Sequence, residues 1–170
     1  MQTRRSLLRA GAVGTAAALA GCLGGGSGGG GSGPGGATLQ SLDVAGSPGG
    51  PVAVLPNEVT LLDYWATWCA PCKPQMAELR EVRETFPGVH MLSITNESDE
   101  PAIRDFWRRY EGTWPVAMDT ELRTNERFDV TGMPTLLVFD PDGGEVWRHV
   151  GLARAKTIAE ILREAGATGR

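Results

Sequence analysis

The order of apolar segments along this chain predicts an α/β fold in which helices flank a mixed central β-sheet. Short β-prone segments alternate with amphipathic helical segments from residue 38 onward. Their order is β, β-α-β, α and then β-β-α, which fits a mixed sheet covered by helices. The chain has 41% hydrophobic residues and only three cysteines, so its core must come from apolar burial and not from a disulfide scaffold.

The first half of the predicted sheet centres on the apolar run at 59–65, whose lack of polar alternation is typical of a strand buried on both faces. The helix after it has its apolar residues on one face, and Pro74 favours a bend near its start. We place strands at 38–44, 59–65 and 89–95, a turn at 46–50 with an edge segment at 51–55, and a helix at 71–84.

Capping and turn signals divide the second half. Ser98 or Asp99 suits a helix N-cap, and Pro101 suits the first turn of that helix. The sequence Asp140-Pro-Asp-Gly-Gly144 is typical of a hairpin turn. We place helices at 99–110, 120–128 and 155–164, and strands at 115–118, 135–139 and 145–150.

The charge of the chain argues against nucleic acid as a partner. The net charge is −4, and the first 22 residues hold three arginines and no acidic residue. The remainder therefore carries −7 and would repel a phosphate backbone.

Residues 1–21 have the anatomy of an export signal. Thr3-Arg-Arg-Ser-Leu-Leu8 is a twin-arginine pattern, and a short apolar stretch at 10–20 follows it. This stretch is too short and too rich in Gly and Ala to indicate a membrane span. Leu19-Ala-Gly-Cys22 then resembles a lipobox, at which bacterial-type lipoproteins are cut and lipidated on the cysteine. An ordinary signal peptide with an incidental Cys22 is the alternative.

Residues 22–36 are predicted to be a lipid anchor and a flexible linker. Ten glycines, two serines and one proline among residues 23–36 cannot bury a core. A lipid on Cys22 would tether the domain at 37–170 to the outer face of the cytoplasmic membrane and leave it free to turn.

Cys69 and Cys72 stand two residues apart at a strand-to-helix junction, which is a redox-motif arrangement. Unpaired backbone N–H groups and the helix dipole favour a thiolate where the helix begins. Cys69 is therefore the candidate nucleophile. Cys72, one turn on, can attack the resulting mixed disulfide and release the substrate.

Two other interpretations of this cysteine pair are weaker. Zinc needs four ligands, but Cys22 is far along the chain and His90 and His149 are isolated, so we expect no metal site. A purely structural disulfide across so tight a loop would constrain the unfolded chain little.

Two further segments add a resemblance to a known superfamily. Residues 62–73, Leu-Asp-Tyr-Trp-Ala-Thr-Trp-Cys-Ala-Pro-Cys-Lys, resemble the active-site strand and motif of thioredoxins. Gly132-Met-Pro-Thr135 resembles their second signature, a cis-proline loop facing the cysteines. Residues 112–119 and 137–151 are similar to the TlpA-like branch of membrane-tethered, extracytoplasmic thioredoxins. The resemblance implies a thioredoxin-like fold over about residues 38–165, with a redox-active disulfide and no other cofactor.

The resemblance also implies a role for Asp63, which matches the buried acid that accepts the proton of the resolving cysteine. A lone carboxylate inside an apolar strand is costly and has a raised pKa. The lysine that often pairs with this acid is missing, because our alignment places Met91 there. An outward-facing strand aspartate is the alternative.

The remaining site residues surround the cysteines. Trp68 is expected to pack beside them and shape the substrate surface, and Ala70 and Pro71 to tune the redox potential. Met133 and Pro134 would form the substrate-binding loop, with Pro134 cis; an ordinary trans turn is the alternative.

We therefore expect an exported, membrane-tethered and monomeric thiol–disulfide oxidoreductase that acts on protein substrates. By family analogy it is a reductase, recharged by a membrane electron donor, with cytochrome c maturation as one possible setting. A disulfide-forming oxidase is the first alternative. The second is a copper-binding chaperone on the same fold, although such proteins tend to use Cys-x-x-x-Cys with a distant histidine.

Overall fold

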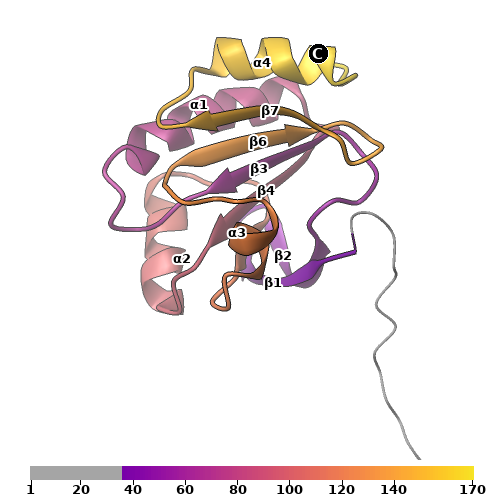
Figure 1. Cartoon of the computed structure of the whole chain (residues 1–170). Helices are drawn as coiled ribbons and strands as arrows, with labels where there is room; N and C mark the ends of the chain where they lie inside the picture. Colours follow the sequence, from indigo (N-terminus) through magenta and orange to yellow (C-terminus); the bar gives the residue numbers. More distant parts are fainter. Residues whose placement is uncertain (1–35) are drawn as a thin grey trace, which may run out of the picture.

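The computed structural model describes residues 36–170, so the predicted signal at 1–21, Cys22 and all but the last linker residue lie outside the described residues. One seven-stranded sheet, in the order β2-β1-β5-β4-β3-β6-β7, crosses the molecule (Figure 1). Its central strands β3, β4 and β5 run parallel, and its other neighbours pair antiparallel. The predicted mixed α/β sheet is thus confirmed. The strands are β1 Thr38–Val44, β2 Ser47–Ala53, β3 Thr60–Tyr64, β4 His90–Thr95, β5 Val116–Met118, β6 Thr135–Phe139 and β7 Glu145–Val150.

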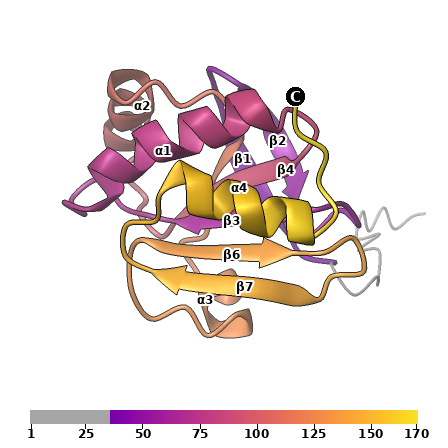
Figure 2. The ribbon, with the colours of Figure 1, turned by 90° about the horizontal axis from the view of Figure 1, so that it is seen from above.

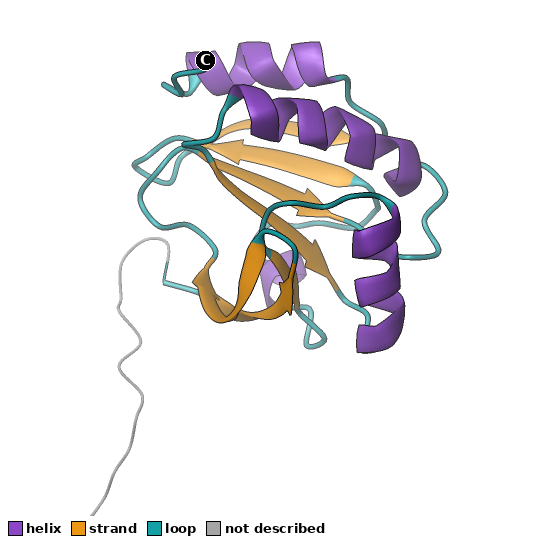
Figure 3. Cartoon of the chain, turned by 180° about the vertical axis from the view of Figure 1, so that it is seen from behind, coloured by secondary structure: helices purple, strands orange, loops and turns teal. Residues whose placement is uncertain are grey.

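Four helices cover the two faces of this sheet. Helices α1 and α4 lie side by side over one face (Figure 2), while α2 stands against the β1 end of the molecule (Figure 3). Helix α3 lies on the opposite face. The described residues contain no helix that is long and apolar enough to cross a membrane. The helices are α1 Cys72–Thr85, α2 Glu100–Arg109, α3 Arg123–Arg127 and α4 Ala155–Glu164.

Strand β3 separates two apolar cores, because every one of its residues is buried. Leu61 and Trp65 face the core beneath α1, α2 and α4, which also contains Cys69 and Cys72. The alternate residues Leu62 and Tyr64 face the second core, on the α3 side. The continuously apolar run predicted this two-sided burial.

Local signals placed several boundaries correctly. The Asp99 carboxylate caps α2 by accepting a hydrogen bond from the Ala102 N–H at 3.1 Å, and Pro101 follows in the first turn. The Asp140 carboxylate accepts from the backbone N–H groups of Asp142 and Gly144, which closes the predicted hairpin turn between β6 and β7.

Two boundaries were wrong. The expected turn at 46–50 is confined to the start of that segment, because β2 begins at Ser47 and carries Pro48 and Pro51 on the sheet edge. Gly46 makes the turn at a φ of +73°, where a Cβ atom would lie 2.0 Å from the Thr113 carbonyl carbon.

Helix α3 begins at Arg123, later than the expected residue 120. The reason is the buried Asp119 carboxylate, which accepts from the backbone N–H groups of Arg123 and Thr124 and so fixes where the helix starts.

Candidate active site

The loop from β3 into α1 carries both motif cysteines. The Cys69 N–H donates to the Ala66 carbonyl at 3.1 Å, and Pro71 is the N-cap of α1. Cys72 is the first residue of the helix, and its sulfur is bonded to that of Cys69 with the two Cα atoms 5.3 Å apart. The redox-motif spacing therefore yields an intramolecular disulfide at the N-terminus of α1.

The two cysteines are almost equally buried in this disulfide form. Cys69 is 3% exposed and Cys72 is 2% exposed, so burial does not distinguish a nucleophile from a resolving thiol. Their positions do differ, since Cys72 is inside the helix and Cys69 precedes it. The side chain of Cys72, in the first turn of α1, points back toward the helix N-terminus. The Cys69 sulfur bonded to it therefore lies ahead of the first residue of the helix.

Trp68 and the proline loop lie around one pocket of about 420 Å³. The Met133–Pro134 peptide bond is cis, as the resemblance implied. Thr135, directly after it, pairs with Tyr64 at the end of β3. The proline loop and the cysteine loop therefore lie at the same end of the neighbouring strands β3 and β6. Trp68 is 73% exposed and presents its ring to solvent instead of packing inward. Ala70 and Pro71 are exposed beside it.

Asp63 is buried at 3% exposure, which excludes the outward-facing alternative. The Ser93 hydroxyl donates to Asp63 Oδ2 at 2.8 Å and accepts from Trp114 Nε1 at 2.8 Å. Asp63 Oδ1 has no hydrogen-bond partner. Our placement of Met91 beside Asp63 was wrong, because Ser93 is its partner on β4 and Met91 pairs with Leu61.

The surroundings of Asp63 set its protonation. Desolvation raises its pKa from 3.8 to about 7, and the hydrogen bond from Ser93 partly opposes that rise. A carboxyl group with this pKa can take up or release a proton near neutral pH. It lies on the same face of β3 as Leu61 and Trp65, whose core contains Cys72.

Glu97, which the sequence did not single out as a site residue, holds the cysteine loop. Its carboxylate accepts from the Thr67 N–H at 2.7 Å, from the Thr67 hydroxyl at 2.6 Å and from the Thr95 hydroxyl at 3.2 Å. Thr67 stands two residues before Cys69. A single acidic side chain thus fixes the backbone that leads into the motif.

Gln75 is a second residue that sequence reasoning missed. Its buried amide donates to the Ala153 carbonyl at 3.1 Å and accepts from the Ala153 N–H at 2.8 Å. This pair joins the first turns of α1 to the segment between β7 and α4. A buried glutamine with both ends satisfied indicates a positioning role.

Replacing Glu97 with alanine is expected to lower the free energy of unfolding by about 2 kcal/mol, because the Thr67 N–H loses a charged acceptor. Urea unfolding of the oxidised protein measures this change. Glu100→Ala is the matched control, since its ion pair with Arg104 is half-exposed and is expected to contribute less than about 1 kcal/mol. Equal losses in the two variants would contradict the assigned role of Glu97.

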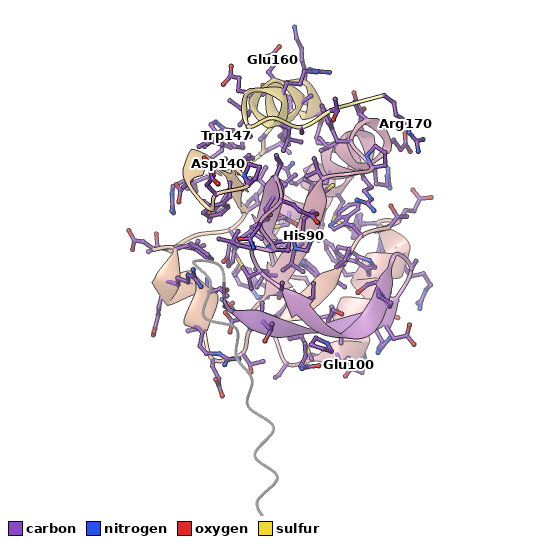
Figure 4. The ribbon with its side chains drawn as sticks, turned by 90° about the vertical axis from the view of Figure 1, so that its right-hand side faces the viewer. His90, Glu100, Asp140, Trp147, Glu160 and Arg170 are labelled. Atoms are coloured by element: carbon purple, nitrogen blue, oxygen red, sulfur yellow. A yellow bond between two sulfur atoms is a disulfide. The ribbon has the colours of Figure 1, made fainter. Side chains whose placement is uncertain are left out.

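The described residues contain no group of three or more His, Cys, Asp or Glu side chains that could hold a metal ion. His90 Nε2 lies 2.9 Å from the Ala53 carbonyl oxygen, and burial lowers its pKa. His149 stacks on Trp147, with the ring planes 5° apart. Figure 4 shows His90 well separated from Trp147, which is on the β6–β7 hairpin.

Comparisons with curated proteins identify relatives of this domain. The thiol-disulfide oxidoreductase ResA of Bacillus subtilis is 28% identical over 110 residues, which are 64% of this chain and 62% of ResA. The thioredoxin-like protein YneN of the same species is 29% identical, over 60% of this chain and 62% of YneN. The matched region thus spans slightly less than two thirds of these relatives.

Solved structures share the fold. DsbF of Mycobacterium tuberculosis superposes with a TM-score of 0.67 at 21% identity, over 75% of this chain and 93% of that one. The pneumococcal exposed lipoprotein thioredoxin gives a TM-score of 0.57 at 21% identity, over 73% and 98% of the two chains. These likenesses confirm the thioredoxin-like fold.

The match to a family covers more of the chain than the alignments with the curated relatives do. The Redoxin family profile covers residues 37–162, from the first residues of the described domain into α4. That span includes the cysteine loop, the cis-proline loop and Asp63. The chain therefore belongs to the Redoxin family.

Proposed function

We propose that this protein is a thiol–disulfide oxidoreductase that exchanges protein disulfides through Cys69 and Cys72, with no other redox cofactor. The observation that supports this most strongly is the disulfide between these two cysteines at the N-terminus of α1, beside the exposed Trp68. The names of the ResA relatives agree with this activity.

In the reducing direction the dithiol form starts the reaction. The Cys69 thiolate attacks one sulfur of a client disulfide, and the other client sulfur leaves as a thiolate that takes a proton from water. Cys72 then gives its proton to the Asp63 carboxylate and attacks the Cys69 sulfur. The second client sulfur departs as a thiolate and takes up the proton that Asp63 releases, and two electrons have moved from the protein to the client.

Asp63 suits this proton transfer for two reasons. Its pKa of about 7 keeps both protonation states accessible near neutral pH. Its Oδ1 atom is buried without a partner, which leaves one oxygen to take the proton. Ser93 holds the other oxygen in place.

We further propose the reductase direction and a place outside the cytoplasmic membrane. The twin-arginine pattern and the lipobox at Cys22 support export and lipid anchoring. The name of the pneumococcal exposed lipoprotein thioredoxin is consistent with this location. A membrane electron donor would restore the dithiol, and apocytochrome c is one candidate client.

The reduction potential of the Cys69–Cys72 couple tests the proposal. We would measure it by equilibration with glutathione buffers in the Cys22→Ala chain, so that only one pair of thiols titrates. A value at or below about −220 mV is expected for a thioredoxin-type reductant. A value near about −120 mV would assign the protein to disulfide formation instead. A pair that exchanges with no thiol buffer would overturn the oxidoreductase assignment.

A further inference from the structure

We propose that the pocket between Trp68 and the cis-proline loop binds a lysine or arginine side chain of the client, close to its reacting cysteine. This inference rests on the proposed function and specifies the class of substrate.

The pocket has apolar walls that suit the aliphatic part of a long side chain. Trp68 and Met133 form part of the wall nearest the cysteine loop, and Leu122 and Val130 complete the apolar lining. Trp68 is 73% exposed and Leu122 is 43% exposed, so a client can reach both. Lysine and arginine bury their methylene stems along such surfaces and keep the charged group at a polar end.

Two residues that line the pocket carry amide oxygens with no hydrogen-bond donor among the described residues. Asn125 is 9% exposed, and its Nδ2 donates to the Val130 carbonyl at 3.4 Å while its Oδ1 has no partner. Asn96 Oδ1 is also buried without a partner. Buried acceptors are normally satisfied, and leaving one unpaired costs free energy. Both oxygens are closed to solvent in this structure, so a client N–H group would supply the missing donor only after the two side chains turn toward the pocket.

The charges around the pocket select a cation. Glu126 and Asp129 bring two exposed carboxylates to it, and none of the ten described residues that line it is a lysine or arginine. Arg148, which reaches the Phe128 and Asp129 carbonyls, is paired with Glu145. The pocket therefore offers acceptors and negative charge to an N–H-rich group.

The opposite side of the cysteine loop has the reverse character. The pocket there is lined by Lys73, Arg108 and Arg109, with Asp105 already paired to Arg108. A cationic side chain next to the client cysteine is repelled from that side. The two pockets together fix the direction in which such a client lies across the motif.

Peptide substrates test the proposal. We would use disulfide-linked peptides with lysine at each position from three before to three after the cysteine, and matched sets with norleucine or glutamate. The second-order rate of reduction by the reduced full-length chain is the measurement. At one position the lysine peptide is expected to react about ten-fold faster than its norleucine match, as one charge-assisted hydrogen bond allows.

Two double variants locate the effect. Glu126→Gln with Asp129→Asn is expected to remove most of the lysine advantage, measured as the ratio of the lysine rate to the norleucine rate. Glu160→Gln with Glu164→Gln removes the same number of charges from exposed positions on α4 and is expected to leave the advantage intact. Equal rates for lysine and norleucine at every position would overturn the proposal, as would an advantage that survives the first double variant.

A binding measurement separates this inference from the proposed activity. The oxidised protein would be titrated with peptides in which serine replaces cysteine, and NMR would follow the Trp68 indole and the Asn96 and Asn125 amides. Selective shifts with the lysine peptide support the pocket even if no peptide is reduced. No selective shift would overturn it whatever the activity.

Discussion

Replacing Cys72 with serine is expected to stop multiple turnover and to leave the client attached to Cys69 through a stable mixed disulfide. The first attack needs only the Cys69 thiolate, whereas release of the client needs a second thiol. Turnover is expected to fall by at least about a thousand-fold, the scale on which loss of an activated catalytic group is felt. Non-reducing electrophoresis and mass spectrometry of the Cys22→Ala background would detect the trapped adduct.

The matched Cys69→Ser variant decides which cysteine attacks. It is expected to form no adduct and to lose turnover as well. This comparison is needed because the two cysteines are buried almost equally in the disulfide form, at 3% and 2% exposure. An adduct formed through Cys72 in the Cys69→Ser variant would reverse the two roles.

The Asp63→Asn variant is expected to gain stability relative to the native chain as pH rises. The pKa of Asp63 is 3.8 in the unfolded reference and about 7 in the folded protein. Below about pH 4 both states are protonated and the buried group imposes no ionisation cost. Between about pH 4 and pH 7 the unfolded state loses its proton first, so the stability of the native chain falls.

The size of that effect follows from the shift. Three pKa units at roughly 1.4 kcal/mol each give on the order of 4 kcal/mol at pH 8. Urea unfolding of both oxidised proteins at pH 4 and pH 8 measures the difference, and the pH 4 pair is the internal control. A gain that is the same at both pH values would show that Asp63 does not titrate on unfolding in this range.

The same variant tests the proposed proton transfer. The rate of Cys72 alkylation would be measured as a function of pH in chains with Cys22 and Cys69 replaced by serine. This pH profile is expected to shift when Asp63 becomes asparagine. An unchanged profile would remove Asp63 from the reaction while leaving its effect on stability intact.

Features encoded locally could be predicted from the sequence. The Asp99 cap and the Asp140 turn depend on side chains that bond to backbone within four residues. The apolar run of β3 predicts a strand buried on both faces, and the one-sided apolar face of α2 predicts which side of the helix is buried. The cysteine motif likewise stands within a single strand-to-helix junction.

Features set by register or by distant segments could not be predicted. Met91 and Ser93 face the same side of β4, because side chains alternate with a period of two. No hydrophobic pattern therefore distinguishes which of them lies beside Asp63. Residues 47–50 of β2 were assigned to a turn, yet Pro48 lies on an edge strand, which tolerates it.

The residues that hold the cysteine loop could not be predicted either, because their partners are far along the chain. Glu97 is 30 positions from Thr67, and Gln75 is 78 positions from Ala153. Neither contact can be recognised in the local sequence pattern, since a glutamate near a helix start and a glutamine in a helix are both common.

The two hydrogen bonds between Gln75 and Ala153 form late in a chain that is synthesised from its N-terminus. Ala153 leaves the ribosome 78 residues after the glutamine that it fixes. Strand β6, which flanks β3 on the side opposite β4, is also made late. While the chain is still growing, Cys69 and Cys72 are therefore two ordinary thiols on an unfinished sheet. Their hydrogen-bonded surroundings are complete only when the chain has been made as far as Ala153.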